Sequence, residues 1–199
     1  MSVEDSYFEA LYQLSDDPWA MRERWYEQRK RALLLACLPR RRYRSVFEPG
    51  CATGETSAAL AERCDALLCS DTAAPAVALS RQRLHGLAHV QVIQSRQPEQ
   101  WPEGTFDLIV LNEIGYYLDS EALDRVTVLA LQSLSEEGQL LACHWRQPIT
   151  GCEFTGDQIH GRLQARMGLT ELLNHQEADF VMTLWSRDPR SVAAHEGLS

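Results

Sequence analysis

An acid and two glycines lie close together in the stretch Glu48-Pro49-Gly50-Cys51-Ala52-Thr53-Gly54, between a short apolar run and an Ala/Leu-rich stretch. We call this predicted turn the glycine turn. Gly50 permits a tight turn with a close backbone approach to a ligand, and Gly54 lets the following helix pack near the strand. A turn that cradles a pyrophosphate would not carry a carboxylate at its mouth. Glu48 therefore favours a ligand that is cationic or lacks phosphates, and the E-x-G-x-x-x-G spacing departs from the G-x-G-x-x-G of dinucleotide sites.

Polar residues also follow two later apolar runs. Asp71 ends the run 66–70, and its separation from Gly54 is close to the ~20 residues expected of an acid that accepts both ribose hydroxyls of an adenosine. Asn112 and Glu113 follow the run 106–111 directly, which places them over the ligand crevice of a parallel sheet. The plainer alternatives are that Asp71 caps the next helix and that Asn112 and Glu113 cap a loop.

Two further groups can carry proton-transfer chemistry. His144 ends the run 139–143, and the adjacent Trp145 can form an aromatic wall against a cation or a sugar ring. Asp157 and His160 are three residues apart at the start of a predicted helix, so they share one face, where the acid can hold the imidazole tautomer. A structural histidine in a turn and a simple helix cap are the alternative interpretations.

Short apolar runs alternate with helical patterns along most of the chain, which predicts parallel strands joined by right-handed helical crossovers. The tail departs from this pattern, because two strands separated by a tight turn at Ala178 predict an antiparallel pair at the sheet edge. Residues 187–199 are expected to be a frayed end. The predicted strands are 45–48, 66–70, 90–94, 106–111, 139–143, 170–177 and 179–186, and the predicted helices are 19–38, 56–64, 73–85, 120–134 and 155–167.

Composition limits the possible classes of protein. The 199 residues are 45% hydrophobic and 24% charged, typical of a single globular domain, here 1–199. The net charge of −9 argues against nucleic acid as a generic partner. The apolar run 32–38 is far short of the ~20 residues of a membrane span, and the acidic start shows no signal pattern. We therefore expect a soluble protein that stays in the cytoplasm, without a membrane partner.

The six cysteines form no C-x-x-C pair, so we expect small buried residues with neither disulfides nor a metal site. Residues 1–40 are expected to form an N-terminal helical lid segment before a core over 45–186. Nine of the 19 basic residues lie between 22 and 44. This basic stretch is either a solvated helix face or the rim of a site that attracts an anionic group.

These motifs resemble the class I S-adenosyl-L-methionine (SAM) dependent methyltransferases and, more narrowly, the nodulation protein S (NodS-like) family. The resemblance implies a Rossmann-like α/β fold with a seven-stranded, mostly parallel sheet of order 3-2-1-4-5-7-6. The matching stretches are Asp17-Pro18-Trp19, Trp25-Tyr26-Glu27-Gln28-Arg29-Lys30, Phe47-Glu48-Pro49-Gly50-Cys51, Phe106-Asp107-Leu108-Ile109-Val110-Leu111, Gly115-Tyr116-Tyr117, Leu141-Ala142-Cys143-His144-Trp145-Arg146, Thr155-Gly156-Asp157, Asp179-Phe180 and Trp185-Ser186-Arg187.

Nodulation protein S methylates the free amine of a deacetylated glucosamine in a chitin-like oligosaccharide. The resemblance therefore implies SAM as the cofactor, S-adenosyl-L-homocysteine (SAH) as its product, and N-methylation of a small-molecule or saccharide amine. Two alternatives stay open: an O-methyltransferase for a small hydroxyl or carboxyl compound, and a non-catalytic nucleotide-binding or NAD-dependent Rossmann protein. The loop after residue 111 lacks the N-P-P-Y pattern of nucleobase methyltransferases, which disfavours a DNA or RNA base as acceptor.

The resemblance also assigns roles within the site. The backbone of the glycine turn would face the amino-acid part of SAM, Asp71 would hold the ribose, and Arg29 or Lys30 would meet the methionyl carboxylate. An amine acceptor must lose a proton before it attacks, so a base is expected within ~3 Å of its nitrogen. The candidate bases, in order, are Glu113, His144, Asp157 and His160. The predicted cofactor contacts are Arg29, Glu48, Gly50, Cys51, Gly54, Asp71 and Asn112.

Overall fold

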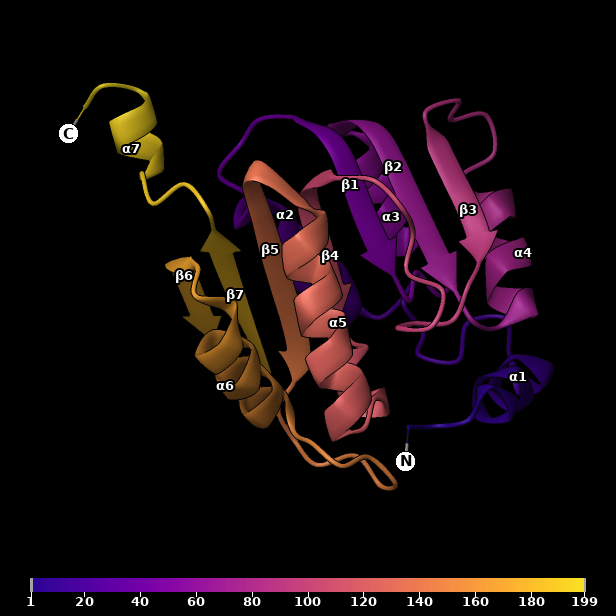
Figure 1. The fold of residues 1–199 in the computed structure, drawn as a ribbon. Helices are drawn as coiled ribbons and strands as arrows, with labels where there is room; N and C mark the ends of the chain where they lie inside the picture. The colour runs from indigo at the N-terminus through magenta and orange to yellow at the C-terminus, as the bar shows by residue number, and fades with distance from the viewer. Residues whose placement is uncertain (1, 199) are drawn as a thin grey trace.

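A seven-stranded sheet organises the chain in a computed structural model that describes residues 2–198. Its strand order, β3-β2-β1-β4-β5-β7-β6, is the order that the resemblance implied, so the predicted fold class is confirmed (Figure 1). The strands are β1 (Tyr43–Pro49), β2 (Cys64–Asp71), β3 (Val90–Gln94), β4 (Phe106–Asn112), β5 (Leu134–Trp145), β6 (Thr170–Gln176) and β7 (Phe180–Ser186).

Strands β1 to β5 pair in parallel, and β7 is antiparallel to both of its neighbours, so β7 is the one strand that runs against the other six. Consecutive residues of β1 from Ser45 to Pro49 pair with Ala66 to Ser70 of β2, and β4 pairs with β5 up to Asn112 and Cys143. The carboxyl ends of β1, β2, β4 and β5 therefore lie at one edge of the sheet. The central strand β4 is buried along its whole length, as its continuous apolar sequence requires.

Helices cover both faces of the sheet. Leu34 of α2 (Trp25–Ala36), Leu60 of α3 (Glu55–Ala61) and Val77 of α4 (Ala74–Arg83) enter one core cluster. Val126 of α5 (Ser120–Ser133) and Leu163 of α6 (Gly156–Met167) enter the cluster on the other face. Figure 1 shows α5 and α6 in front of the sheet and α2 and α3 behind it. The remaining helical elements are α1 (Asp5–Leu14), the 3₁₀ turn η1 (Gly115–Tyr117) and α7 (Val192–His195).

Several predicted boundaries differ from the structure for local reasons. The helix predicted over 19–38 begins only at Trp25, because Ala20 has a φ of 54° and Asp17 accepts hydrogen bonds from the Met21 and Arg22 amides. Gly54, with a φ of 81°, begins α3 without a side-chain cap, so Thr56 does not cap it. The tail predicted to be frayed contains the short helix α7.

The N-terminal segment crosses the carboxyl edge of the sheet. The Val3 amide donates to the Tyr117 carbonyl oxygen at 2.8 Å, and Asp5 pairs with Arg96 at 2.5 Å. All six cysteines are free; four are buried, and Cys37 and Cys152 are half-buried. Within residues 2–198, no helix combines the length and the apolar character needed to cross a bilayer.

Candidate active site

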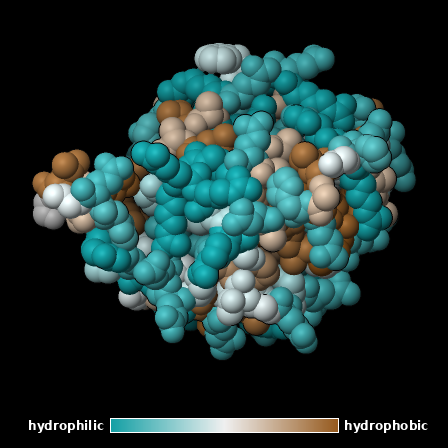
Figure 2. Space-filling model, turned by 90° about the horizontal axis from the view of Figure 1, so that it is seen from above, coloured by the Kyte–Doolittle hydropathy of each residue, from teal (hydrophilic) through white to brown (hydrophobic). Residues whose placement is uncertain are grey.

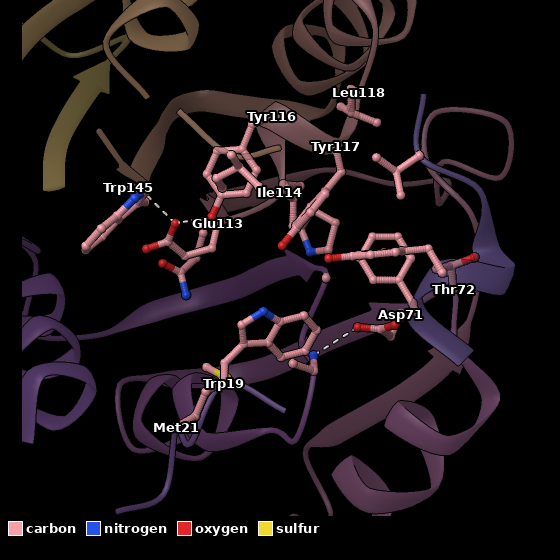
Figure 3. Close-up of a pocket in the computed structure, with 18 of the residues that line it drawn as sticks. Trp19, Met21, Asp71, Thr72, Glu113, Ile114, Tyr116, Tyr117, Leu118 and Trp145 are labelled. Atoms are coloured by element: carbon pink, nitrogen blue, oxygen red, sulfur yellow. Dashed lines mark hydrogen bonds between the residues drawn. The ribbon is translucent and has the colours of Figure 1, made fainter. Parts of the chain in front are cut away.

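A cavity of about 580 Å³ lies at the carboxyl edge of β1, β2, β4 and β5, with α1 and the start of α2 closing over it. Figure 3 shows Asp71 and Thr72 on one side of this pocket and Glu113 and Trp145 on the other. The opposite edge of the sheet, which faces the viewer in Figure 2, carries mostly hydrophilic side chains. Aromatic rings form much of the pocket lining, namely Tyr7, Phe8, Tyr12, Trp19, Tyr26, Tyr116, Tyr117 and Trp145.

The glycine turn forms one wall of the pocket with its backbone. The amides of Gly50 and Cys51 both donate to the Ser70 carbonyl oxygen, at 2.7 and 2.9 Å, which folds the turn over the end of β2. Gly50 has a φ of 73°, and a Cβ there would overlap Cγ2 of Ile114. Only glycine satisfies both conditions without strain, as the sequence predicts.

Asp71 stands at the end of β2 and lines the same wall. One carboxylate oxygen accepts from the Ala52 amide at 2.9 Å and the other from the Ala73 amide at 3.0 Å. Burial raises the pKa of Asp71, and the backbone donors, which favour the charged form, oppose this effect. The carboxylate thus supports the start of α4 and also lines the pocket, and its contact with a ribose stays a prediction.

Three residues predicted to contact the ligand from the turn lie behind it. Glu48 is 1% exposed and hydrogen-bonds Ser57 at 2.5 Å, and burial raises its pKa to about 8. The Cys51 side chain packs against Ser80, and Gly54 begins α3. Glu48 therefore does not form the expected acidic mouth, because its side chain turns under the loop, and Asp71 is the carboxylate that lines the pocket at this wall.

Unpartnered polar atoms gather at the pocket. Among residues 2–198, Asn112 Oδ1 and the hydroxyls of Tyr12 and Tyr26 are buried without a hydrogen-bond partner, and all three side chains line the cavity. Buried polar atoms are rarely left unpaired in native proteins. All three atoms are therefore free to bond to a molecule in the cavity, and the role of Asn112 as a cofactor contact stays a prediction.

Glu113 is the centre of a charge cluster on the opposite wall. Its Oε1 accepts from Lys30 Nζ at 2.5 Å, and its Oε2 accepts from the Trp145 amide at 2.9 Å and from the Tyr116 hydroxyl. Figure 3 shows the carboxylate turned toward Trp145 and Tyr116. Glu113 has a φ of 58°, a backbone conformation that costs energy for a residue with a side chain and is frequent at functional sites.

Lys30 joins the covering helix α2 to this cluster. It is 6% exposed, lies 3.1 Å from Glu27 and stands over the Tyr26 ring, 4.9 Å from its centroid. Burial alone would lower the pKa of Lys30, but the carboxylates of Glu113 and Glu27 outweigh it, so the pKa is raised and the side chain is charged. Arg29, by contrast, forms a bidentate pair with Glu177 at 2.7 and 2.8 Å and does not line the pocket.

The other three candidate bases lie outside the pocket lining. His144 is fully buried and bonds to the Gly115 amide and to His160. Asp157 forms a bidentate pair with Arg146 at 2.9 and 3.0 Å rather than bonding to His160. The predicted pairing of Asp157 with His160 is therefore wrong, because helix α6 turns His160 inward and Asp157 outward.

Sequence reasoning missed most of the aromatic cover. The rings of Tyr7, Phe8, Tyr12 and Trp19 all come from the first 19 residues, a density of aromatic side chains that could have indicated a ligand cover. Arg24 also lines the pocket, and its guanidinium makes no ion pair or hydrogen bond with any residue from 2 to 198. Tyr116 lines the cavity as well and bonds to Glu113, a contact that the sequence does not indicate.

Comparison with known proteins shows which family the sequence of this chain resembles. The chain matches the sequence model of nodulation protein S (NodS) over residues 10–159. The nodulation protein S of Rhizobium tropici is 33% identical over 129 residues, which cover 64% of this chain and 54% of that protein. That of Sinorhizobium fredii is 31% identical over 121 residues, covering 60% and 56%. This chain spans about half the length of these curated relatives.

Solved structures share the fold. A candidate methyltransferase from Pseudomonas syringae is 54% identical, with a TM-score of 0.74 over 82% of this chain and 99% of that one. The N-methyltransferase NodS from Bradyrhizobium japonicum WM9, in complex with SAH, is 24% identical, with a TM-score of 0.83 over 94% of this chain and all of that one. With three quarters of its sequence matched by the family model, the chain belongs to the nodulation protein S family.

Proposed function

We propose that this protein is a SAM-dependent methyltransferase that N-methylates the amine of a small molecule or an amino sugar. The observation that carries the proposal is the pocket itself, in which a glycine turn, an aspartate and unpartnered polar atoms face one cavity at the carboxyl edge of the sheet. Family membership and the description of the Bradyrhizobium japonicum relative as an N-methyltransferase bound to SAH support it.

The residues of the glycine wall fit the cofactor. SAM supplies a methyl group activated by a positively charged sulfur. The backbone at Gly50 and Ala52 leaves room for the amino-acid part, and Asp71 offers carboxylate oxygens to ribose hydroxyls. Asn112 Oδ1 and the Tyr12 hydroxyl offer hydrogen bonds that the protein leaves unmade. We assign the carboxylate contact to Arg24 rather than to Arg29 or Lys30. Arg24 lines the pocket and forms no ion pair among residues 2–198, whereas Arg29 and Lys30 are paired with carboxylates of the protein.

The Glu113 wall fits an amine acceptor. Of the four candidate bases, only Glu113 lines the cavity, and its Oε1 keeps a lone pair beyond its bond to Lys30. The rings of Tyr116 and Trp145 beside it suit a cationic amine. Glu113 would take the ammonium proton, while the aromatic cover of α1 and Trp19 excludes water and aligns the acceptor nitrogen.

Ligand binding tests the first half of the proposal. Calorimetric titration with SAM, SAH and NAD should show binding of SAM and SAH and no binding of NAD. Purified protein is then incubated with SAM and separate panels of amino sugars, polyamines and phenols, and products are analysed by fragmentation mass spectrometry. A methyl group located on nitrogen supports the proposal, one located on oxygen shows an O-methyltransferase, and binding of NAD alone rejects both.

Glu113→Gln tests the proposed base with the acceptor found in that panel. We expect kcat at saturating SAM to fall by about 100-fold, the usual contribution of a general base, with SAH affinity changed by less than about threefold. Asp157→Asn is the matched control, because it neutralises a carboxylate that does not line the pocket, and its kcat should match that of the unaltered protein. Undiminished turnover by Glu113→Gln removes Glu113 from this role.

A further inference from the structure

The end of β5 holds the pocket loop that follows β4 at three points. The Glu113 amide donates to the Cys143 carbonyl oxygen at 2.8 Å, and the Gly115 amide donates to His144 Nε2 at 3.0 Å. The Trp145 amide donates to the Glu113 carboxylate at 2.9 Å. Three consecutive strand residues therefore fix the loop, two of them through the backbone and His144 through its side chain.

The position of this loop matters to both walls of the pocket. Glu113 is the centre of the charge cluster, and Ile114 occupies the space that a side chain at Gly50 would need. Gly115 itself has no room for a side chain, since a Cβ would lie 2.8 Å from both His144 Nε2 and Cγ2 of Ile159. The loop and the His144 ring are thus packed against each other as closely as the backbone allows.

The bond from Gly115 determines which nitrogen of His144 carries the proton. An amide N–H can only donate, so His144 Nε2 must be the unprotonated, accepting nitrogen. In the neutral ring the proton is then on Nδ1, which lies 3.1 Å from His160 Nε2 and donates to it. His160 Nε2 is likewise an acceptor, so its proton is on Nδ1, 2.8 Å from the Thr183 hydroxyl oxygen.

Both rings are buried in surroundings that keep them neutral. Burial lowers the pKa of His144 to about 3, with Lys30 adding to the effect, and burial holds the pKa of His160 well below its usual value. The groups facing the two rings are Lys30 from α2, Glu113 from the loop, Tyr116 from η1, Asp157 from α6, and Thr183 and Trp185 from β7.

We propose that His144 and His160 are positioning residues of this methyltransferase, which hold the loop of Glu113 and Ile114 in place through one fixed pair of imidazole tautomers. A chain of hydrogen bonds runs from the Gly115 amide through His144 and His160 to the Thr183 hydroxyl, which also accepts from Asn174 at 3.3 Å. The two histidines would thus serve the reaction without touching its reactants. This role in catalysis rests on the proposed function.

The tautomers can be observed directly. In protein labelled with ¹⁵N-histidine, NMR should show His144 and His160 as neutral rings protonated on Nδ1, with shifts that do not titrate between about pH 5 and 8. His85 and His175, which the structure leaves partly accessible, provide internal references. A ring of His144 or His160 that is protonated on Nε2, or that titrates within this range, overturns the proposal whatever the enzyme binds.

Two substitutions distinguish the hydrogen bond that His144 accepts from Gly115 from the one that it donates to His160. His144→Gln can place a carboxamide oxygen where Nε2 accepts from Gly115, whereas His144→Asn can donate to His160 but leaves the Gly115 amide without an acceptor. We expect the SAH dissociation constant to rise about tenfold in His144→Asn and less than about threefold in His144→Gln, because an unsatisfied buried donor is costly. Hydrogen exchange at the Gly115 amide should accelerate only in His144→Asn.

Val126→Ala serves as the stability control, since Val126 is fully buried in α5 and takes no part in the chain of hydrogen bonds through His144 and His160. It should lower the unfolding temperature while leaving SAH affinity within about twofold of the unaltered protein. Equal SAH affinity in the Asn and Gln variants, with losses no greater than in the control, would show that His144 is only a core residue. If the unaltered protein fails to bind SAH, the proposed function fails, and the NMR result still decides the tautomers.

Discussion

The wall around Gly50 is made of backbone from one short stretch of chain, whereas the wall around Glu113 is made of side chains from separate elements. The glycine turn is held by amides that donate to Ser70 and Asp71. Glu113 is held by Lys30 from α2, Tyr116 from η1 and the end of β5, residues separated by up to 115 positions (Figure 3).

The two walls therefore depend on different interactions. In the glycine wall, shape is decisive, because a φ of 73° and the contact with Ile114 exclude a side chain at Gly50. In the Glu113 wall, charge is decisive, because the buried ammonium of Lys30 pairs with the carboxylates of both Glu113 and Glu27. Substitutions that add atoms should damage the first wall, and substitutions that remove a charge should damage the second.

The largest effect should follow from adding a methyl group at Gly50. Gly50→Ala should cost about 3 kcal/mol of stability, from the left-handed backbone and the overlap with Ile114, and should abolish SAH binding. Gly86→Ala is the matched control, since Gly86 has a φ of 88° but nothing within 4 Å of its Cβ position. Urea denaturation should give it a loss of only about 1 kcal/mol, and equal losses in both variants would show that shape at Gly50 is unimportant.

Removing the charge of Lys30 should come next. Lys30→Met leaves the carboxylates of Glu113 and Glu27 without their buried partner, and we expect a loss of about 2–3 kcal/mol in urea denaturation. The double variant Lys30→Met/Glu113→Gln should recover part of this loss, because one uncompensated charge is then gone. Strictly additive losses in this double-mutant cycle would mean that the two side chains are not energetically coupled.

The sequence predicted the glycine wall because its residues act through local spacing. A strand, a glycine turn, a helix and an acid in that order fix the relative positions of Gly50 and Asp71, and the strand order places both at the ligand edge. The same reasoning put Asn112 and Glu113 over the crevice. It failed for Glu48, since the direction in which a side chain leaves the end of a strand depends on Ser57 in the next helix.

The Glu113 wall was less predictable because its contacts are tertiary. Arg29 and Lys30 are adjacent in a basic stretch, and only the rotation of α2 against the sheet decides which of them meets Glu113. Similarly, the spacing of Asp157 and His160 permits a contact but does not show that His160 turns toward His144 in the core. Charges are numerous in this region, so sequence alone could not select the pairs.

The buried histidines beneath the Glu113 wall should make the stability of the whole protein sensitive to acid. The folded-state pKa of His144 is about 3, below the ordinary 6.5, so the unfolded chain binds the extra proton first as the pH falls. The stability advantage of the unaltered protein over His144→Gln should therefore be fully present above pH 6.5. Below it, the advantage should shrink by up to about 1.4 kcal/mol per pH unit.

Urea denaturation of both proteins at pH 7.5, 6 and 5 measures this difference, and the comparison cancels groups that titrate in the same range away from His144. Glu48 is one such group, since burial raises its pKa to about 8 and its contribution has the opposite sign, favouring the folded state as the pH falls. A stability difference between the two proteins that stays constant over this range would mean that His144 takes up a proton equally in both states.

The smallest effect should follow from Arg29→Ala, one position away from Lys30. Arg29 and Glu177 form an exposed pair that is screened by solvent, so the unfolding temperature should shift by less than about 2 °C and SAH affinity by less than about twofold. The contrast with Lys30→Met then isolates the side chain that faces the pocket, because both substitutions remove one positive charge from the same helix. A large loss of SAH affinity in Arg29→Ala would mean that α2 presents its other face to the ligand. The charge cluster at Glu113 would then describe only one position of a covering helix that moves when the ligand binds.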